Sequence, residues 1–546
     1  MNIIFKNKKF DSEELDELLT NYYVDFSKVK SIAVIMKRSP QMLWLLYKAF
    51  CSGITYIPID PSEPVDKVNF ILNQTQPDIV LCEEYKYNYS KTRTNDYDNV
   101  GYILYTSGTT GSPKGVLINK ESLVNFIDGV SEIIDFSERK KIASFTSMSF
   151  DIFFLESVMA IIKNMTIVLA DEYEQKNPRA MSKLIYDSGV DMLQLTPSRL
   201  QLLLNYDRDL CCLKNIKEIM IGGEPLSITL LQELQRKTEA RIYNMYGPTE
   251  ATIWSTIGDL TNSSSVNIGY PIKNTEIYIV DNDMNILPVG KKGEICIAGK
   301  GLAKGYHQKD VLTAEKFVCL QNYNKKIVYK TGDIGKQNTD GTFECFGRVD
   351  NQIKLRGHRI ELEEIEAILN QYIGITCSLV CVHVINDVDK LLHVFYTGDK
   401  DIIIDDIKNY LNNKLSSYMV PDIYERIDDF VLTINGKIDR KYYDDLLNSK
   451  TTHYNEKTLE MLLNIKEKII RIIKENTSGF TGEINETSSF KELGYDSISF
   501  IKTILAIEDG FGFEFDDEYI IISKYQCIGD MVDYVIKKAK TNVIMD

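Results

Sequence analysis

Short runs of aliphatic residues alternate with longer amphipathic stretches over much of the chain. The aliphatic runs predict buried strands at residues 31–36, 78–82, 166–170 and 218–223. The stretches between them have the spacing of helices. Such an alternation is typical of α/β layers built on mostly parallel sheets. We therefore predict an α/β fold for this part of the chain.

One polar segment between two predicted strands has an unusual composition. Residues 102–105 and 116–118 read as strands, and the segment between them is TSGTTGSPKG. A loop of this kind offers many backbone N–H groups and hydroxyls, and its glycines let a ligand approach the backbone closely. A surface hairpin would also fit, but Lys114 favours a phosphate-binding loop. It is not a Walker loop, because Pro113 precedes the lysine.

Two changes of pattern indicate domain boundaries. Around residues 347–350 the chain passes from strand-rich sequence into a charged helix, predicted at residues 358–369. Residues 447–458 form a polar run without periodicity, which is typical of a linker. The segment beyond this run has a helical pattern throughout.

Length, charge and cysteine usage narrow the class of protein. A chain of 546 residues exceeds one hydrophobic core, which predicts several folding units. The net charge of −15 argues against nucleic acid or an anionic membrane as the main partner. The N-terminus lacks a signal-peptide core, and no apolar run reaches the length of a membrane span. The ten cysteines form no CxxC pair, so we expect reduced thiols in a cytoplasmic protein.

Four further segments share the polar, glycine-containing character of the loop. They are NMYGPTEAT (244–252), predicted as one tight turn, YKTGDIG (329–335), GRVDNQIKLRGHRIELEEIE (347–366) and INGKIDR (434–440). Each alone has a structural explanation, with Thr249 a turn residue, Asp333 a turn cap, Arg348 a surface charge and Lys437 a solvated side chain. In this order and spacing, however, the five motifs resemble the adenylate-forming enzymes, specifically the amino-acid adenylation domains of nonribosomal peptide synthetases, over about residues 30–445.

The resemblance implies an architecture and a reaction. A large multi-sheet α/β lobe would span residues 1–349, and a small mobile α+β lobe would span residues 350–447, with its hinge at Asp350. Such an enzyme joins a carboxylate to ATP, releases pyrophosphate and leaves an acyl-adenylate. The attacking carboxylate is already ionised, so no general base is needed. In one lobe orientation Lys437 would reach the site, and in the other the region 355–357 would face an incoming thiol.

The resemblance also implies which residues bind the nucleotide. They are Thr106, Ser107, Gly108, Thr109, Thr110, Lys114, Gly223, Glu224, Pro225, Asn244, Tyr246, Gly247, Thr249, Asp333 and Arg348. In the predicted roles, the loop from Thr106 to Lys114 holds the β- and γ-phosphates, and Thr249 contacts the α-phosphate. Tyr246 stacks on adenine, with Asn244 near the adenine amino group. Asp333 accepts hydrogen bonds from both ribose hydroxyls with the help of Arg348. Glu250 would hold Mg²⁺, and Lys437 would bridge the substrate carboxylate and the nucleotide. Lys437, Thr249 and Glu250 are thus the predicted catalytic residues.

The segment FKELGYDSISFIKTIL places Ser497 before an apolar helical pattern at Ile498, Ile501 and Leu505. Alone, an Asp–Ser pair is more simply a helix cap. After an adenylation domain it resembles the LGxDS motif of peptidyl carrier domains, whose serine carries 4′-phosphopantetheine. The resemblance implies a linker at residues 448–458 and an all-α helical-bundle carrier domain at residues 459–546. Tyr495 stands where glycine is common in peptidyl carriers, which moves the motif somewhat toward acyl carriers.

The segment SFDIFFLESV (149–158) matches the family's substrate-pocket motif. Asp151 falls where amino-acid-specific members pair the substrate ammonium, although it could also be a strand-end cap. The other implied pocket positions are Ile152, Leu155, Gln194, Met220, Gly222, Met245, Ile253 and Trp254. Bulky groups at Ile152, Leu155 and Trp254 leave little room beyond the substrate α-carbon, and the set resembles glycine-activating domains.

The sequence therefore predicts ATP- and Mg²⁺-dependent activation of glycine and its transfer to a phosphopantetheine arm on Ser497. Three alternatives stay open: a ligase for alanine or another small amino acid, an acid–thiol ligase outside peptide synthesis, and a non-catalytic scaffold that presents the carrier. No HHxxxDG condensation motif or GxSxG thioesterase motif is present. The expected partners are a phosphopantetheinyl transferase and a downstream condensation or other acceptor enzyme in trans, with a small activator protein as a further candidate.

Overall fold

The computed structural model divides the chain into two compact units. The first contains Met1–Val380 and Val394–Asp428, and the second contains Cys381–His393 and Asp429–Asp546. The structure describes residues 1–20, 24–83, 86–88, 97–107, 113–207, 210–320, 325–348, 352–355, 358–384, 390–399, 402–431, 438–447, 468–477, 488–490, 493, 495, 497–511, 515, 519, 525 and 528–543.

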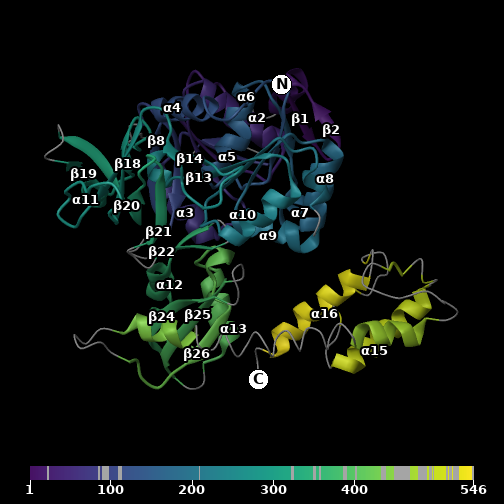
Figure 1. The fold of residues 1–546 in the computed structure, drawn as a ribbon. Helices are drawn as coiled ribbons and strands as arrows, with labels where there is room; N and C mark the ends of the chain where they lie inside the picture. Colours follow the sequence, from purple (N-terminus) through teal and green to yellow (C-terminus); the bar gives the residue numbers. More distant parts are fainter. Residues whose placement is uncertain are drawn as a thin grey trace. The chain divides into compact units, whose positions relative to one another are not determined.

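The larger of two mixed sheets in the first unit is mostly parallel, as the alternating pattern predicts (Figure 1). Its order is β15 (Tyr270–Pro271), β14 (Thr256–Asp259), β13 (Arg241–Tyr246), β12 (Glu218–Gly222), β11 (Met192–Leu195), β9 (Lys141–Ser144), β10 (Thr166–Leu169), β1 (Asn2–Phe5) and β2 (Lys8–Phe10). The five consecutive pairs from β13 to β1 are parallel. Strands buried on both faces need continuous apolar runs, which explains why β10 and β12 could be located from the sequence.

The second mixed sheet carries the polar loop. Its order is β18 (Gly305–Tyr306), β8 (Lys114–Asn119), β7 (Val100–Thr106), β4 (Thr55–Ile59), β3 (Ser31–Ile35), β5 (Ile79–Cys82) and β6 (Lys86–Asn88). Strands β7 and β8 are antiparallel, with Thr106 opposite Lys114. Lys114 is therefore the first residue of a strand, so both ends of the predicted loop are fixed by the sheet.

Antiparallel strands follow in the chain. A five-stranded sheet has the order β16 (Thr275–Val280), β17 (Gly293–Gly299), β20 (Lys326–Gln337) and β19 (Phe317–Leu320), with β21 (Phe343–Arg348) paired to β20. Two smaller sheets are the hairpin of β22 (Gln352–Leu355) and β23 (His358–Glu361), and the sheet β24 (Ile375–Val384), β25 (Lys390–Gly398) and β26 (Ile423–Arg426).

The helix predicted at residues 358–369 is wrong in its first four residues. These residues form β23, and helix α12 spans only Leu362–Leu369. Ile360 is fully buried and pairs with Ile353 of β22. Pairing with a neighbouring strand therefore overrides the helical preference of this glutamate-rich segment.

The segment predicted as one tight turn at residues 244–252 is also divided differently. Asn244 and Tyr246 end strand β13, whereas Thr249 and Glu250 lie on the 3-10 helix η4 (Thr249–Ala251). Strand and helix thus present these side chains from separate elements.

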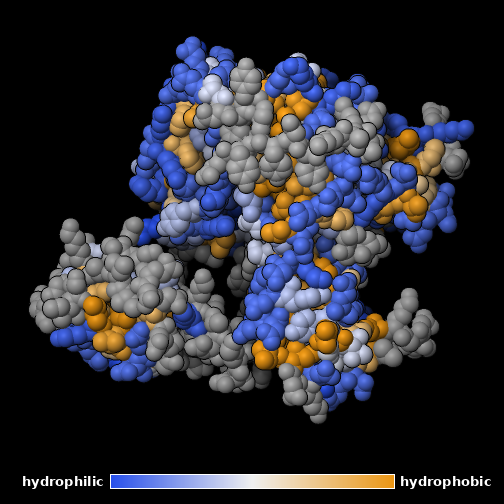
Figure 2. All heavy atoms as spheres, turned by 180° about the vertical axis from the view of Figure 1, so that it is seen from behind, coloured by the Kyte–Doolittle hydropathy of each residue, from blue (hydrophilic) through white to orange (hydrophobic). Residues whose placement is uncertain are grey.

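The remaining helices cover the sheets or connect their strands. They are α1 (Ser12–Leu19), α2 (Pro40–Cys51), α3 (Val65–Thr75), α4 (Lys120–Ser131), α5 (Ile152–Phe154), the π-helical turn η2 (Leu155–Met159), α6 (Ala160–Ile162), α7 (Glu172–Lys176), α8 (Pro178–Ser188), α9 (Pro197–Tyr206), η3 (Cys211–Leu213), α10 (Ile228–Lys237), α11 (Asp310–Lys316), α13 (Ile404–Asn412) and η5 (Ser417–Met419). On the face seen in Figure 2, hydrophobic side chains gather in separate patches among hydrophilic ones. Among the described residues, none of the helices has the length and apolar character to cross a membrane.

The second unit contains the helices α15 (Ser497–Phe511) and α16 (Ile528–Val543). Helix α15 begins at Ser497 itself. Its buried residues Phe500, Ile504 and Ile507 belong to one apolar cluster with Ile528 and Val535 of α16. The helix predicted for this segment is present, but the predicted apolar positions are wrong, because Ile501 and Leu505 are exposed and Phe500, Ile504 and Ile507 face the core instead.

Candidate active site

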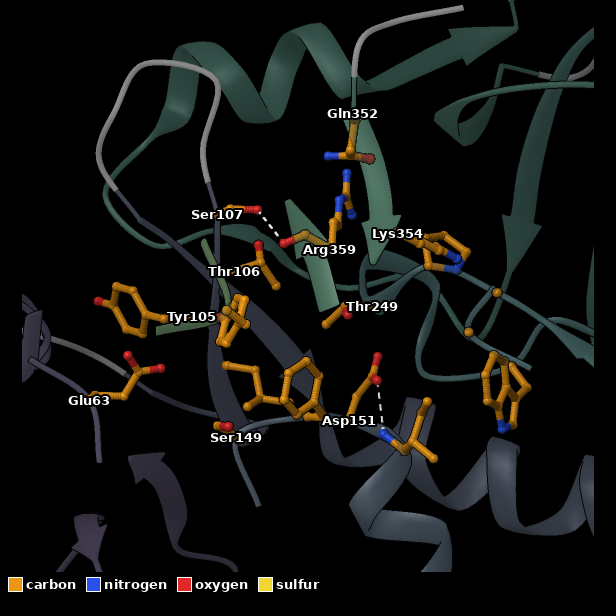
Figure 3. Close-up of a pocket in the computed structure, with 18 residues that line it drawn as sticks. Glu63, Tyr105, Thr106, Ser107, Ser149, Asp151, Thr249, Gln352, Lys354 and Arg359 are labelled. Carbon is orange, nitrogen blue, oxygen red and sulfur yellow. Dashed lines mark hydrogen bonds between the residues drawn. The ribbon is translucent and has the colours of Figure 1, made fainter. Parts of the chain in front are cut away.

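A cavity in the first unit joins segments that are far apart in the sequence (Figure 3). It encloses about 850 Å³ of empty space, open solvent included. Eight of the residues predicted from the sequence line it: Thr106, Ser107, Asp151, Ile152, Gly223, Gly247, Thr249 and Trp254. The structure thus brings the polar loop, the predicted substrate pocket and the 244–252 motif to one place.

The buried carboxylate of Glu250 is surrounded by cations and a hydroxyl. It lies 2.8 Å from Arg359 Nη1 and 3.8 Å from Lys114 Nζ, and the Tyr306 hydroxyl donates to it at 2.7 Å. Burial alone would raise the pKa of Glu250, but Arg359 and Lys114 hold this pKa well below its usual range. Glu250 is therefore anionic at neutral pH, as a ligand of a hard cation must be.

Opposing effects act on the pKa of the buried Lys114 ammonium. Burial and the neighbouring Arg359 lower the pKa of Lys114 to about 8, although Glu250 and Glu361 act in the opposite direction. Glu361 Oε1 lies 3.7 Å from Lys114 Nζ. A ligand phosphate would add negative charge beside this ammonium and favour its charged form.

Asp333, Tyr246 and Arg348 form a second polar cluster. The Tyr246 hydroxyl donates to Asp333 Oδ2 at 2.6 Å, and Arg348 Nη1 donates to Asp333 Oδ1 at 2.7 Å. Asp333 and Arg348 face each other across strands β20 and β21. Asn244 Nδ2 donates to the Asn267 carbonyl at 2.7 Å. Asp333 is thus neither a turn cap nor isolated, since it sits inside a strand with two side-chain partners.

Trp254 is held deep in the predicted substrate pocket by an unusual backbone. Thr252 and Ile253 have φ values of +59° and +69°, a left-handed conformation that β-branched residues rarely adopt. The Trp254 ring packs so closely on Gly222 that a Cβ there would lie 2.7 Å from Trp254 Cη2. The backbone strain and the glycine together fix the indole in the pocket wall.

The other predicted pocket residues pack behind this wall. Leu155, Gln194, Met220, Met245 and Ile253 are each at most 2% exposed and do not line the cavity themselves. Leu155 begins the π-helical turn η2, a feature that often marks functional sites. The cavity wall thus has an inner layer of side chains that line the cavity and an outer layer that packs behind them.

Comparison with known proteins shows what this site is similar to. A family model described as AMP-binding enzyme matches residues 83–307. This part of the chain is therefore similar to the AMP-binding enzymes. A second model, the phosphopantetheine attachment site, matches residues 467–535. The chain therefore combines a segment similar to AMP-binding enzymes with a segment similar to phosphopantetheine attachment sites.

The curated relatives that match this chain are longer than it is. Gramicidin S synthase 2 of Brevibacillus brevis is 34% identical over 435 residues, covering 75% of this chain and 10% of the relative. Tyrocidine synthase 1 of Brevibacillus parabrevis is 31% identical over 540 residues, covering 92% of this chain and 48% of the relative. The chain thus spans between a tenth and about half of the length of these two relatives.

A solved structure of similar organisation supports the predicted fold class. A holo nonribosomal peptide synthetase protein with adenylation and carrier domains, bound to a vinylsulfonamide inhibitor, is 20% identical with a TM-score of 0.71. The match covers 97% of this chain and 93% of that one. The predicted α/β fold followed by a helical domain is confirmed.

Several residues predicted from the sequence lie outside the residues that the structure describes. They are Gly108, Thr109, Thr110, Asp350 and Lys437, as well as the predicted linker at residues 448–458. Ser497 is described as the start of α15, but its side chain is not. Glu224 accepts hydrogen bonds from the backbone N–H and the hydroxyl of Ser198, so it caps helix α9 beside the cavity. Pro225 follows it.

The structure adds cavity residues to which the sequence assigned no role. Gln352, Lys354 and Arg359 reach the cavity from the β22–β23 hairpin, and Glu63 and Tyr418 line it from other segments. The density of Arg and Lys in residues 347–366 was a signal for the first group. Nothing local distinguishes Glu63 or Tyr418, because only the tertiary fold brings them to the cavity.

The residues present fit ATP with Mg²⁺. Thr106 Oγ1 lines the cavity, is buried and has no hydrogen-bond partner within the part of the chain that the structure describes, so a phosphate oxygen would satisfy it. The described residues contain no cluster of three His, Cys, Asp or Glu side chains. Mg²⁺ held by Glu250 would take its other ligands from phosphates and water, which is its common mode of binding.

Tyr495, which departs from the peptidyl carrier motif, has a structural role in the second unit. Its hydroxyl donates to the Ile473 carbonyl at 3.0 Å and accepts from Thr503 Oγ1 at 3.1 Å. Its ring packs on Phe490 with the centroids 5.3 Å apart. Packing inside the helical core accounts for an aromatic residue at this position.

Proposed function

We propose that this chain activates glycine with ATP and loads it onto a phosphopantetheine arm on Ser497. In the first step a carboxylate oxygen of glycine forms a bond to the α-phosphorus, and the bond to pyrophosphate breaks. In the second step the pantetheine sulfur forms a bond to the glycyl carbonyl carbon, AMP leaves, and the thiol proton is released. The lobes at residues 1–349 and 350–447, the hinge at Asp350, and the carrier at residues 459–546 belong to this proposal.

One observation carries the proposal. The cavity that contains Asp151 and Trp254, the proposed amino-acid residues, also contains Thr106, Ser107 and Thr249, the proposed phosphate residues. A carboxylate and an α-phosphate bound there would meet in one space. Holding two reactants in this way is the main source of rate enhancement for a reaction that needs no general base. Lys437 would neutralise the two anions, Glu250 would hold Mg²⁺, and Asp333 with Arg348 would bind the ribose.

Amino-acid-dependent ATP–pyrophosphate exchange across a panel of amino acids tests the proposal. We expect glycine to give the fastest exchange, with alanine the principal error, because one methyl group is discriminated by only about 10- to 200-fold. A preference for alanine would support the second candidate, a ligase for small amino acids. Exchange with none of the panel would favour a scaffold that only presents the carrier.

The proposed partners follow from the carrier domain. A phosphopantetheinyl transferase would attach the arm, and a downstream condensation or other acceptor enzyme would take the glycyl thioester in trans. A small activator protein is a further candidate partner. Each would be detected as a requirement for loading or for product release in a reconstituted reaction.

Trimming the pocket wall is expected to enlarge the accepted side chain. Trp254→Ala and Leu155→Ala each remove a side chain that is at most 1% exposed, so room appears beyond the α-carbon of glycine. We expect kcat/KM for alanine relative to glycine to rise at least about ten-fold, the scale of one buried methylene or methyl contact. The ratio is measured by pyrophosphate exchange with each amino acid.

Leu203→Ala is the matched control for this pocket experiment. Leu203 is equally buried but belongs to the other large apolar cluster, away from Trp254. Its truncation is expected to lower stability by about 2–5 kcal/mol without changing the alanine-to-glycine ratio. An unchanged ratio in both pocket variants would contradict selection by filled volume.

Asp151 is expected to bind the ammonium group that all amino acids share. Asp151→Ala should weaken every amino acid alike by about ten- to a hundred-fold, the scale of a lost charged hydrogen bond. Burial raises the pKa of the Asp151 carboxyl, and a hydrogen bond from Thr249 only partly opposes this. Because the ionised form binds ammonium, glycine binding should be strongest above this raised pKa and be lost as the pH falls through it.

The pH dependence of KM for glycine provides the control. In the wild type we expect KM to rise toward acid pH, and in Asp151→Asn we expect a weak but pH-independent KM over the same range. A variant that retains the wild-type pH profile would show that another group binds the ammonium. If Asp151→Ala weakened the binding of one amino acid only, Asp151 would contact the substrate side chain instead of the ammonium group.

A further inference from the structure

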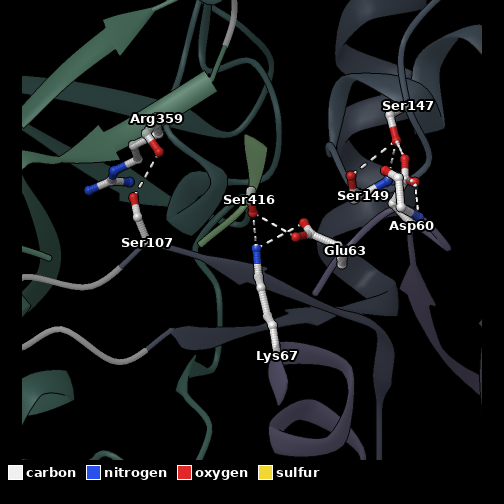
Figure 4. A network of polar contacts seen from close by, with 9 residues as sticks. Asp60, Glu63, Lys67, Ser107, Ser147, Ser149, Arg359 and Ser416 are labelled. Atoms are coloured by element: carbon white, nitrogen blue, oxygen red, sulfur yellow. Dashed lines mark hydrogen bonds and ion pairs between the residues drawn. The ribbon is translucent and has the colours of Figure 1, made fainter. Parts of the chain in front are cut away.

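Glu63, Lys67 and Ser416 form a closed polar network at the edge of the cavity (Figure 4). Lys67 Nζ donates to Glu63 Oε1 and to Ser416 Oγ, both at 2.8 Å. Ser416 Oγ in turn donates to Glu63 Oε2 at 2.6 Å. Each of the three side chains therefore bonds to both of the others.

The members of this network come from distant parts of the chain. Glu63 and Lys67 flank the start of α3, whereas Ser416 directly precedes η5 and lies 349 residues beyond Lys67. The side chains of Lys67 and Glu63 are 13% and 10% exposed, and Ser416 is 3% exposed. Two charges removed from water in this way need every available hydrogen bond, because their desolvation is expensive. The Ser416 hydroxyl supplies both a donor and an acceptor.

A stack of rings connects the network to the hairpin that enters the cavity. The ring of Tyr418, two residues after Ser416, stacks on the ring of His358 with the centroids 3.7 Å apart. The ring of Phe150 also packs on His358, with the centroids 4.6 Å apart. His358 begins strand β23, and the next residue, Arg359, reaches Glu250. The Ser107 hydroxyl also donates to the Arg359 carbonyl at 2.7 Å. Ser416 therefore lies at one end of a continuous set of contacts that ends on the carboxylate of Glu250.

The three bonds of the network respond differently if Ser416 moves away from Glu63 and Lys67. Glu63 and Lys67 are four residues apart at the start of α3, so their ion pair persists without Ser416. Burial alone would lower the pKa of Lys67, but Tyr418 and Glu63 outweigh this and raise it, so the ammonium stays charged. When Ser416 moves away, water can solvate the pair. The hydroxyl thus stabilises only the arrangement in which the hairpin occupies the cavity.

We propose that Ser416 is a positioning residue whose bonds to Glu63 and Lys67 hold the β22–β23 hairpin, with Lys354 and Arg359, in the cavity. This arrangement favours transfer of the acyl group to the thiol over formation of the adenylate. While Arg359 contacts Glu250, the same carboxylate oxygen is not open to Mg²⁺. The inference rests on the proposed function, because it assigns Ser416 to one of that function's two steps.

Ser416→Ala in the full-length holo protein separates the two steps. We expect single-turnover transfer from preformed glycyl-adenylate to the Ser497 arm to slow about ten-fold, the scale of lost hydrogen bonds to charged groups. Glycine-dependent pyrophosphate exchange is expected to be unchanged or faster. Ser417→Ala, the same substitution at the exposed neighbouring serine, is the matched control and should leave both rates as in the wild type.

Hydrogen exchange of the hairpin provides a readout that a general loss of stability would not give. In Ser416→Ala the amides of residues 352–361 should exchange faster, while those of the β3–β4 core and of α15 should not change. Equal slowing of both half-reactions, or unchanged hairpin exchange, would overturn the role of Ser416. If the wild type lacked any amino-acid-dependent pyrophosphate exchange, the proposed function would fail, but the hairpin exchange would still test the contact.

Discussion

We expect Lys437→Ala to slow glycine-dependent ATP–pyrophosphate exchange by at least about a hundred- to a thousand-fold. The scale is that of removing one electrostatic contact made to charge in a transition state. Lys437 is proposed to bridge two anions, the substrate carboxylate and the α-phosphate. Transfer from preformed glycyl-adenylate to a pantetheine thiol should survive far better, because the hairpin rather than Lys437 then faces the cavity.

Lys441→Ala is the control for this experiment. Lys441 is an exposed lysine four positions farther along the chain, and its removal should change neither rate. The two half-reactions are measured separately, by exchange for the first and by intact-mass detection of the glycyl thioester for the second. If Lys437→Ala slowed both by the same factor, the proposal of two lobe orientations would be wrong, and Lys437 would have a structural role.

Ser497→Ala is expected to abolish covalent loading of glycine completely. The phosphopantetheine arm requires a side-chain oxygen at this position, so no thiol can form in the variant. Pyrophosphate exchange should stay close to the wild-type rate, since it precedes thiol attack. Intact-mass measurement after treatment with a phosphopantetheinyl transferase distinguishes the apo, holo and glycyl forms.

Ser499→Ala is the control that tests whether the arm is attached specifically at position 497 and not at another serine of the same helix. Ser499 lies two residues farther along the same helix, α15. The control variant should acquire one arm and one glycyl group like the wild type. An adduct that persists in Ser497→Ala, or one that maps to another residue, would refute the assignment of Ser497.

The two lobe orientations compete for one carboxylate in this proposal. Glu250 is fully buried and contacts Arg359 of the β22–β23 hairpin. A buried anion needs a cation at all times, because an unpaired charge in the interior is strongly unfavourable. In this structure Arg359 and Lys114 supply that positive charge, and Mg²⁺ held by Glu250 would supply part of it when the hairpin leaves the cavity.

Local sequence determined the strands and the motif positions. Strands β3, β10 and β12 are buried on both faces of a sheet, so their consecutive residues are apolar and the strands can be recognised in the sequence. The loop between β7 and β8 could be located for the same reason, since strong strand patterns flank it. The helix predicted at residues 358–369 failed over His358–Glu361, where the partner strand β22 decides the conformation.

By itself, the sequence thus predicted the kind of chemistry: an adenylating domain with its polar loop, Asp151, Glu250 and Asp333, followed by a proposed carrier serine at position 497. These features depend on residue type and order, which a linear pattern records. Only the tertiary structure decided which side chains meet. Arg359 on Glu250 and Ser416 on Glu63 and Lys67 are contacts across 109 to 353 residues of chain. Such pairs leave no local periodicity, because their energy comes from burial and charge complementarity that exist only once the segments are packed.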